Sequence, residues 1–133
     1  MDEMKYTVLV VDDHPLMRKG IVQLLALEEN MEVTGEASNG TDAVALAKES
    51  EPDLILLDLN MKGLSGLDTL KALRAEEITS RVVILTVSDA RQDVVALLKA
   101  GADGYLLKDT EPDLLLAQLA DVMTGKQILS EPL

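Results

Sequence analysis

The feature that most constrains the fold is a regular alternation of five short apolar runs with five longer segments of helical periodicity. The apolar runs are too short for typical helices and are bounded by turn or charged residues, which is typical of strands. We expect strands at residues 6–11, 32–35, 53–57, 81–86 and 104–107, and helices at 15–27, 40–48, 66–74, 91–100 and 112–123. This alternation predicts an α/β fold with a parallel sheet, because each helix can form the crossover that two parallel strands need.

The composition of the strands indicates how the sheet is covered. The first, third and fourth runs are almost continuously apolar, as expected when helices cover both faces of a parallel sheet. Pro15 and Pro112 suit the first turn of a helix, while Asn39, Gly40 and Gly101 mark turns. We therefore expect one domain built on a five-stranded, doubly wound parallel sheet with helices on both faces.

Composition and charge exclude several classes of protein. The chain has no cysteine and one histidine, so neither a disulfide framework nor a zinc site is expected. A formal net charge of -12 repels a phosphate backbone, so we expect no direct binding of nucleic acid. No apolar run approaches the span of a bilayer, and the N-terminal residues carry acid where a secretory signal carries base. We therefore expect a cytoplasmic protein that does not enter a membrane.

Polar residues stand at the ends of four of the five apolar runs. Asp12 and Asp13 follow the first run, Asp58 follows the third, Thr86 ends the fourth, and Lys108 follows the fifth. In open α/β sheets, ligands bind beyond the carboxyl ends of the strands. If the first, third, fourth and fifth strands lie side by side in the flavodoxin-like order, these side chains meet at one edge of the sheet.

Three carboxylates gathered at one edge would repel one another unless a cation lay among them. Mg²⁺ fits such a donor set best, because it takes oxygen ligands in an octahedron and keeps several waters. Asp58 would then act as a nucleophile toward phosphorus, while the metal and Lys108 neutralise charge on the phosphoryl oxygens. Thr86 would donate a hydrogen bond to the same group.

Four segments carry a resemblance to a known family that covers nearly the whole chain. They read Val-Val-Asp-Asp-His-Pro at 10–15, Leu-Leu-Asp-Leu-Asn-Met at 56–61, Leu-Thr at 85–86 and Gly-Ala-Asp-Gly-Tyr-Leu-Leu-Lys at 101–108. Together they resemble the receiver domains of two-component response regulators, in particular those of the NarL/FixJ branch. The resemblance implies the (βα)5 flavodoxin-like receiver fold.

The resemblance also implies how the acidic residues act. Asp58 would receive a phosphoryl group from the phosphohistidine of a sensor histidine kinase. Mg²⁺ would be held by Asp13, by Asp58 and by the backbone carbonyl of Asn60, with Asp12 acting through water. His14 is interpreted as a helix-entry residue close to the site.

Further residues are implied to read or tune the phosphorylation. Lys108 and Thr86 would contact the phosphoryl group. Thr86 would move toward it and Tyr105 would turn inward, which reshapes the surface around the fourth helix and fifth strand. Asn60 and Ser88 would tune the phosphoryl lifetime. The alternatives are that Thr86 serves strand packing and that Tyr105 is a half-buried aromatic with a solvated hydroxyl.

The resemblance further implies the organisation and partners of the protein. Residues 1–126 would form the receiver domain, and residues 127–133 would begin a linker toward a C-terminal helix-turn-helix domain that is absent from this chain. The implied partners are a sensor histidine kinase, the protein's own DNA-binding domain in its full-length form, and a second copy on activation. Phosphorylation would thereby switch a transcriptional regulator.

Three other functions match parts of the pattern. A haloacid-dehalogenase-like phosphohydrolase uses an aspartate nucleophile with Mg²⁺, but needs a second aspartate where this chain has Asn60. A flavodoxin-like cofactor binder would need a hydroxyl-rich phosphate loop and aromatic residues, which are only 2% of this chain. A pseudo-receiver that binds partners without phosphorylation stays the alternative. We expect a phosphoacceptor rather than an enzyme that turns over a separate substrate.

Overall fold

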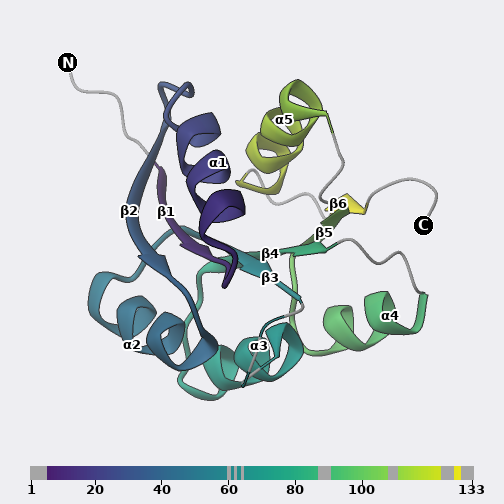
Figure 1. Ribbon diagram of the computed structural model, residues 1–133. Coiled ribbons are helices and arrows are strands. Elements are labelled where there is room, and N and C mark those ends of the chain that lie inside the picture. Colours follow the sequence, from purple (N-terminus) through teal and green to yellow (C-terminus); the bar gives the residue numbers. More distant parts are fainter. Residues whose placement is uncertain are drawn as a thin grey trace.

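The computed structural model places a parallel sheet between two layers of helices (Figure 1). It describes residues 6–59, 61, 63, 65–86, 91–107, 111–123 and 128–129, with the backbone alone at 91–94 and 128–129. The strands are β1 (Tyr6–Val11), β2 (Met31–Ala37), β3 (Leu54–Asp58), β4 (Arg81–Thr86), β5 (Gly104–Leu107) and β6 (Ile128–Leu129). The helices are α1 (Pro15–Leu25), α2 (Gly40–Ser50), α3 (Gly66–Ala75), α4 (Arg91–Lys99) and α5 (Pro112–Met123).

The sheet has the order β2-β1-β3-β4-β5-β6, and all neighbouring strands pair in parallel. The predicted α/β class, the five predicted strands and the five predicted helices are confirmed. The strand order reverses at β1, so the ends of β1 and β3 flank the crevice where doubly wound sheets bind ligands. Strand β6 is an addition that the apolar pattern does not predict, and it pairs with β5 within the segment 127–133.

Local chemistry explains where the helices begin. Pro15 occupies the first turn of α1, where its missing N–H costs nothing. The Oδ1 atom of Asn39 accepts a hydrogen bond from the backbone N–H of Asp42 at 2.8 Å, and Ser65 Oγ accepts one from the N–H of Asp68 at 3.1 Å. None of the helices in the described part of the chain has the length and apolarity that a bilayer crossing requires.

The core consists of two apolar layers, one on each face of the sheet. Helices α1 and α5 cover one face, and helices α2, α3 and α4 cover the other (Figure 1). In β1, Val8 and Val10 pack with α1 and α5, whereas Leu9 and Val11 pack on the opposite face, because strand side chains alternate. Full burial of each such side chain contributes about 1.5–3 kcal/mol relative to exposure. The sheet is therefore a rigid base for the residues at its strand ends.

Candidate functional site

Two buried carboxylates lie at the carboxyl ends of the central strands. Asp12 directly follows β1 and Asp58 is the last residue of β3, and only 1% and 2% of their surfaces are exposed. Strands β1 and β3 are paired, with Val11 opposite Leu57, so the residues that follow these positions lie side by side. The structure thus brings together two residues that are 46 positions apart in the sequence.

Asp13 and His14 complete a cluster with these two carboxylates. One ligand atom from each of Asp12, Asp13, His14 and Asp58 lies within 4.8 Å of the others. The Nδ1 atom of His14 lies 3.1 Å from Asp12 Oδ1, 3.0 Å from Asp13 Oδ1 and 3.8 Å from Asp58 Oδ2. The His14 side chain is 65% exposed, so it covers the outer side of the cluster. His14 is also the N-cap residue of α1, as its interpretation as a helix-entry residue requires.

The donor set of this cluster fits a hard divalent cation. It offers three carboxylates and no sulfur, which is the chemistry that Mg²⁺ prefers. Adjacent corners of a Mg²⁺ octahedron are about 3.0 Å apart, because metal–oxygen distances are about 2.1 Å. Opposite corners are about 4.2 Å apart, so donor atoms that lie within 4.8 Å of one another need only a small inward shift to share one cation. A cation would also relieve the repulsion among the carboxylates.

A guanidinium fixes the backbone beside the cluster. Arg18 Nη1 donates a hydrogen bond to the carbonyl oxygen of Asp12 at 2.7 Å, and Arg18 Nε donates to Glu36 Oε1 at 3.1 Å. The backbone N–H of Asp12 donates to the carbonyl of Ala37 at 3.0 Å. Neither Arg18 nor Glu36 was predicted as part of the site. The sequence signal that could have identified Arg18 is its position one helical turn after His14. Helical side chains lean toward the helix N-terminus, so a cation at this position lies near the site.

The loop that follows Asp58 is held by close backbone contact with α3. The Gly66 N–H donates to the carbonyl of Leu59 at 2.9 Å, and the Leu59 N–H donates to the carbonyl of Leu85 at 3.1 Å. A Cβ atom at Gly66 would lie 2.6 Å from both the carbonyl oxygen of Asp58 and the Cα of Leu59. Only glycine allows this approach, so Gly66 helps to place the candidate nucleophile.

The two predicted switch residues occupy the strands on the other side of β3. Thr86 ends β4 and is fully buried, and Tyr105 in β5 is also fully buried. The Tyr105 side chain belongs to the core layer of α2, α3 and α4, and its backbone pairs with Ile84 of β4. The Tyr105 side chain is therefore buried rather than half-buried, and its role as a switch residue stays a prediction.

Three predicted site residues, Asn60, Ser88 and Lys108, lie outside the described residues. Their roles stay predictions. Lys108 directly follows Leu107, the last residue of β5, which pairs with Thr86 at the same edge of the sheet.

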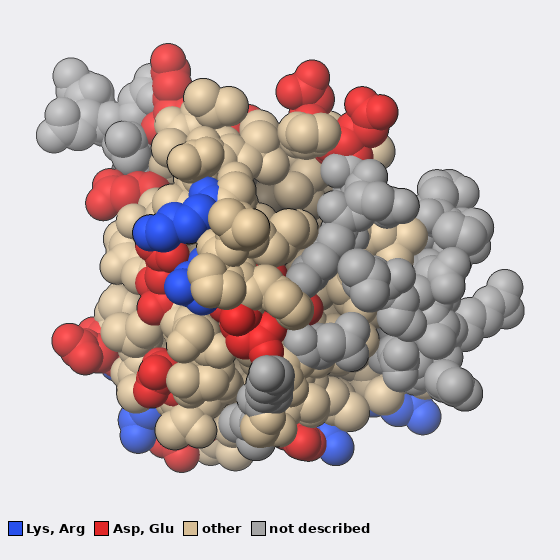
Figure 2. Space-filling view, in the orientation of Figure 1, with Lys and Arg blue, Asp and Glu red and all other residues tan. Residues whose placement is uncertain are grey.

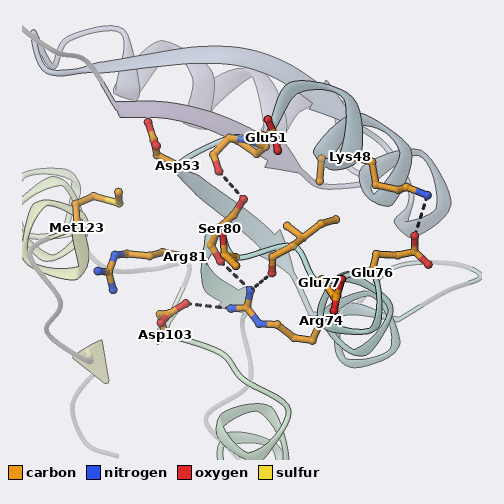
Figure 3. Close-up of a pocket in the computed structure, with 14 residues that line it drawn as sticks. Lys48, Glu51, Asp53, Arg74, Glu76, Glu77, Ser80, Arg81, Asp103 and Met123 are labelled. Carbon is orange, nitrogen blue, oxygen red and sulfur yellow. Dashed lines mark hydrogen bonds and ion pairs between the residues drawn. The ribbon is translucent and has the colours of Figure 1, made fainter.

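The amino end of the sheet carries a hollow of about 910 Å³. Figure 3 shows Arg74 pointing toward Asp103 across this hollow. The guanidinium also donates hydrogen bonds to the backbone carbonyls of Ile78, Ser80 and Gly101. The chain's own acceptors therefore engage Arg74, so this hollow is not the candidate site. The candidate site is the acidic cluster at the carboxyl end of the sheet, where Figure 2 shows acidic side chains gathered beside basic ones.

Comparisons with known sequences agree on one family. Residues 8–120 match the family described as response regulator receiver domain. A nitrate/nitrite response regulator protein homolog of Haemophilus influenzae is 59% identical over 127 residues, which are 96% of this chain and 61% of that protein. The nitrate/nitrite response regulator NarP of Escherichia coli is 55% identical over 126 residues, 95% of this chain and 59% of NarP. The motifs quoted above resemble those of NarP, and this similarity is confirmed. The chain spans about three fifths of the length of these relatives.

Comparison with solved structures supports the same assignment. The signal receiver domain of the response regulator NarL from Mycobacterium tuberculosis superimposes with a TM-score of 0.89 at 37% sequence identity. The match covers 93% of this chain and 100% of that one. The flavodoxin-like fold expected from the sequence is thereby confirmed.

Proposed function

The chain belongs to the response regulator receiver domain family, and from this premise we propose that it is a switch that accepts a phosphoryl group on Asp58. The observation that carries the proposal is the acidic cluster. Asp58 lies at the end of a buried strand with Asp12 and Asp13 beside it, at the sheet edge where open α/β folds bind ligands.

The proposed reaction is transfer from a phosphohistidine to a carboxylate. An oxygen of Asp58 attacks phosphorus, and a P–O bond forms as the P–N bond to the donor histidine breaks; the departing imidazole takes up a proton. Mg²⁺, held by Asp13, Asp58 and the backbone carbonyl of Asn60, with Asp12 acting through water, would neutralise charge on the phosphoryl oxygens. Lys108 is proposed to contact the same oxygens.

We propose that Thr86 and Tyr105 convert phosphorylation into a change of surface. Both are buried on adjacent strands, so a shift of Thr86 toward the phosphoryl group changes the packing available to Tyr105. A ligand changes a conformational equilibrium only through contacts that differ between the two states. Thr86 would supply that contact, and Asn60 and Ser88 would set how long it lasts.

We infer the partners from the family to which the chain belongs. The phosphoryl donor would be a sensor histidine kinase in the cytoplasm, and the receiver of the signal would be a C-terminal DNA-binding domain joined through residues 127–133. A second copy would join on activation. Because the relatives are named nitrate/nitrite response regulators, we propose regulation of transcription in response to these anions. The chain would be a phosphoacceptor rather than an enzyme with a separate substrate.

Intact mass spectrometry tests the proposal. The wild-type chain and Asp58→Asn are incubated with Mg²⁺ and acetyl phosphate, a small phosphodonor. We expect the wild type to gain one phosphate, and we expect no gain in Asp58→Asn or after addition of a metal chelator. A folded wild type that gains no phosphate would overturn the proposal in favour of a pseudo-receiver.

A further inference from the structure

Arg18 joins three elements next to the acidic cluster. It projects from α1, and 18% of its side chain is exposed. Its Nη1 donates to the carbonyl oxygen of Asp12 at the end of β1, and its Nε donates to Glu36 in β2. The first contact, at 2.7 Å, is a short charge-assisted hydrogen bond.

This contact acts on Asp13 through the geometry of the peptide bond. The Asp12 carbonyl belongs to the same planar unit as the Asp13 N–H, so fixing the oxygen fixes where Asp13 leaves the chain. On its other side, Asp12 is held by the hydrogen bond from its N–H to the carbonyl of Ala37. Arg18, which is itself outside the cluster, thus restrains the backbone from which Asp13, a proposed metal ligand, extends.

Glu36 in turn determines how Arg18 presents its planar group. The guanidinium fork has a rigid geometry, so the Nε bond to Glu36 Oε1 at 3.1 Å aims Nη1 at the carbonyl. Lys19 Nζ lies 4.0 Å from the other oxygen of Glu36, so that carboxylate is held between two cations. A lysine at position 18 would keep the charge but lose the fork.

We infer that Arg18, oriented by Glu36, is a positioning residue that sets the geometry in which Asp12 and Asp13 hold the divalent cation. This inference rests on the proposed function. Groups that orient metal ligands typically contribute about 10–100-fold to metal affinity. The Arg18–Glu36 pair would therefore determine how tightly the switch binds its cation, without touching the phosphoryl group.

Titration of the full chain with Mg²⁺ by calorimetry tests this inference, with displacement of Mn²⁺ followed by electron paramagnetic resonance as a second readout. We expect Arg18→Ala to weaken Mg²⁺ binding by about tenfold or more. Arg18→Lys and Glu36→Gln should give smaller losses, because each retains part of the contact. The matched control is Arg74→Ala, which removes a guanidinium of the opposite sheet end and should leave the Mg²⁺ affinity unchanged.

The outcomes separate the inference from the proposed function. If the wild type binds Mg²⁺ and accepts phosphate but Arg18→Ala binds Mg²⁺ equally well, the inference is overturned and the function stands. A wild type that binds neither Mg²⁺ nor Mn²⁺ would overturn both. If Arg18→Ala does not fold, Arg18→Lys and Glu36→Gln decide: wild-type affinity in both of these folded variants contradicts the inference.

Discussion

The two ends of the sheet use charge in opposite ways. At the carboxyl end, three carboxylates of Asp12, Asp13 and Asp58 crowd together beside one exposed imidazole. At the amino end, Arg74 meets acceptors that the chain itself supplies, among them Asp103 at 3.2 Å (Figure 3). The first end concentrates like charges that repel one another, whereas the second pairs a cation with fixed oxygens.

This difference separates the residues that hold the fold together from those that carry the chemistry. Arg74 joins α3 to the segments that precede β4 and β5, so the amino end contributes stability. At the carboxyl end, the carboxylates of Asp12, Asp13 and Asp58 repel one another, and a bound cation would relieve that repulsion. Substitutions at the amino end should therefore change the free energy of unfolding, and substitutions at the carboxyl end should change ligand binding as well.

The largest expected effect is that of Arg74→Ala at the amino end. The substitution removes hydrogen bonds to the carbonyls of Ile78, Ser80 and Gly101, together with the ion pair to Asp103. We expect the free energy of unfolding to fall by about 3 kcal/mol, because partly buried acceptors lose a charged donor. Urea denaturation measures this loss of free energy. The folded variant should gain phosphate from acetyl phosphate as the wild type does. A fall below about 1 kcal/mol would show that the amino end does not depend on Arg74.

Gly66→Ala tests the carboxyl end by steric means. The new Cβ would lie 2.6 Å from backbone atoms of Asp58 and Leu59, so the loop must shift. We expect a loss of about 2 kcal/mol in the free energy of unfolding, together with slower phosphorylation. The control is Gly20→Ala in α1, where a Cβ meets nothing within 4 Å and the helix should gain about 0.5–1 kcal/mol. Equal phosphorylation rates in both variants would contradict the role given to Gly66.

Asp13→Asn is expected to stabilise the protein, whereas Arg74→Ala and Gly66→Ala are expected to destabilise it. Removing one of three clustered charges should raise the free energy of unfolding by about 1 kcal/mol in a metal chelator, because like-charge repulsion falls. Added Mg²⁺ should stabilise the wild type in proportion to its occupancy and should stabilise the variant far less. Thermal unfolding with and without Mg²⁺ measures both effects. A variant less stable than the wild type in the chelator would contradict the repulsion.

The smallest expected effect is that of Lys48→Ala. Lys48 and Glu76 join α2 to α3 at 2.8 Å, but their side chains are 57% and 44% exposed. Exposed pairs are screened by solvent, so we expect a change below about 0.5 kcal/mol in the free energy of unfolding. Urea denaturation beside Arg74→Ala gives a direct comparison of two cations that line the same hollow. A loss as large as that of Arg74→Ala would show that burial does not distinguish them.

The order of elements could be read from local patterns. Helical and strand periodicity reside in neighbouring residues, so the bounds of β1, β4, β5 and α5 agree with the expected ranges. The short strand β6 could not be predicted, because two residues carry no period and their pairing depends on the edge of β5. The cluster of Asp12, Asp13 and Asp58 could be predicted, because the carboxyl ends of parallel strands lie at a common edge of the sheet.

What the sequence determined by itself was the alternation of elements and the acidic residues at the strand ends, since both depend on positions close together in the chain. Only the tertiary structure decided which side chains support them. Arg18 reaches Glu36 across 18 positions and Arg74 reaches Gly101 across 27, each between separate elements. A lone arginine in a helix has no local signature for such a contact, because its long side chain reaches a partner that only packing brings near.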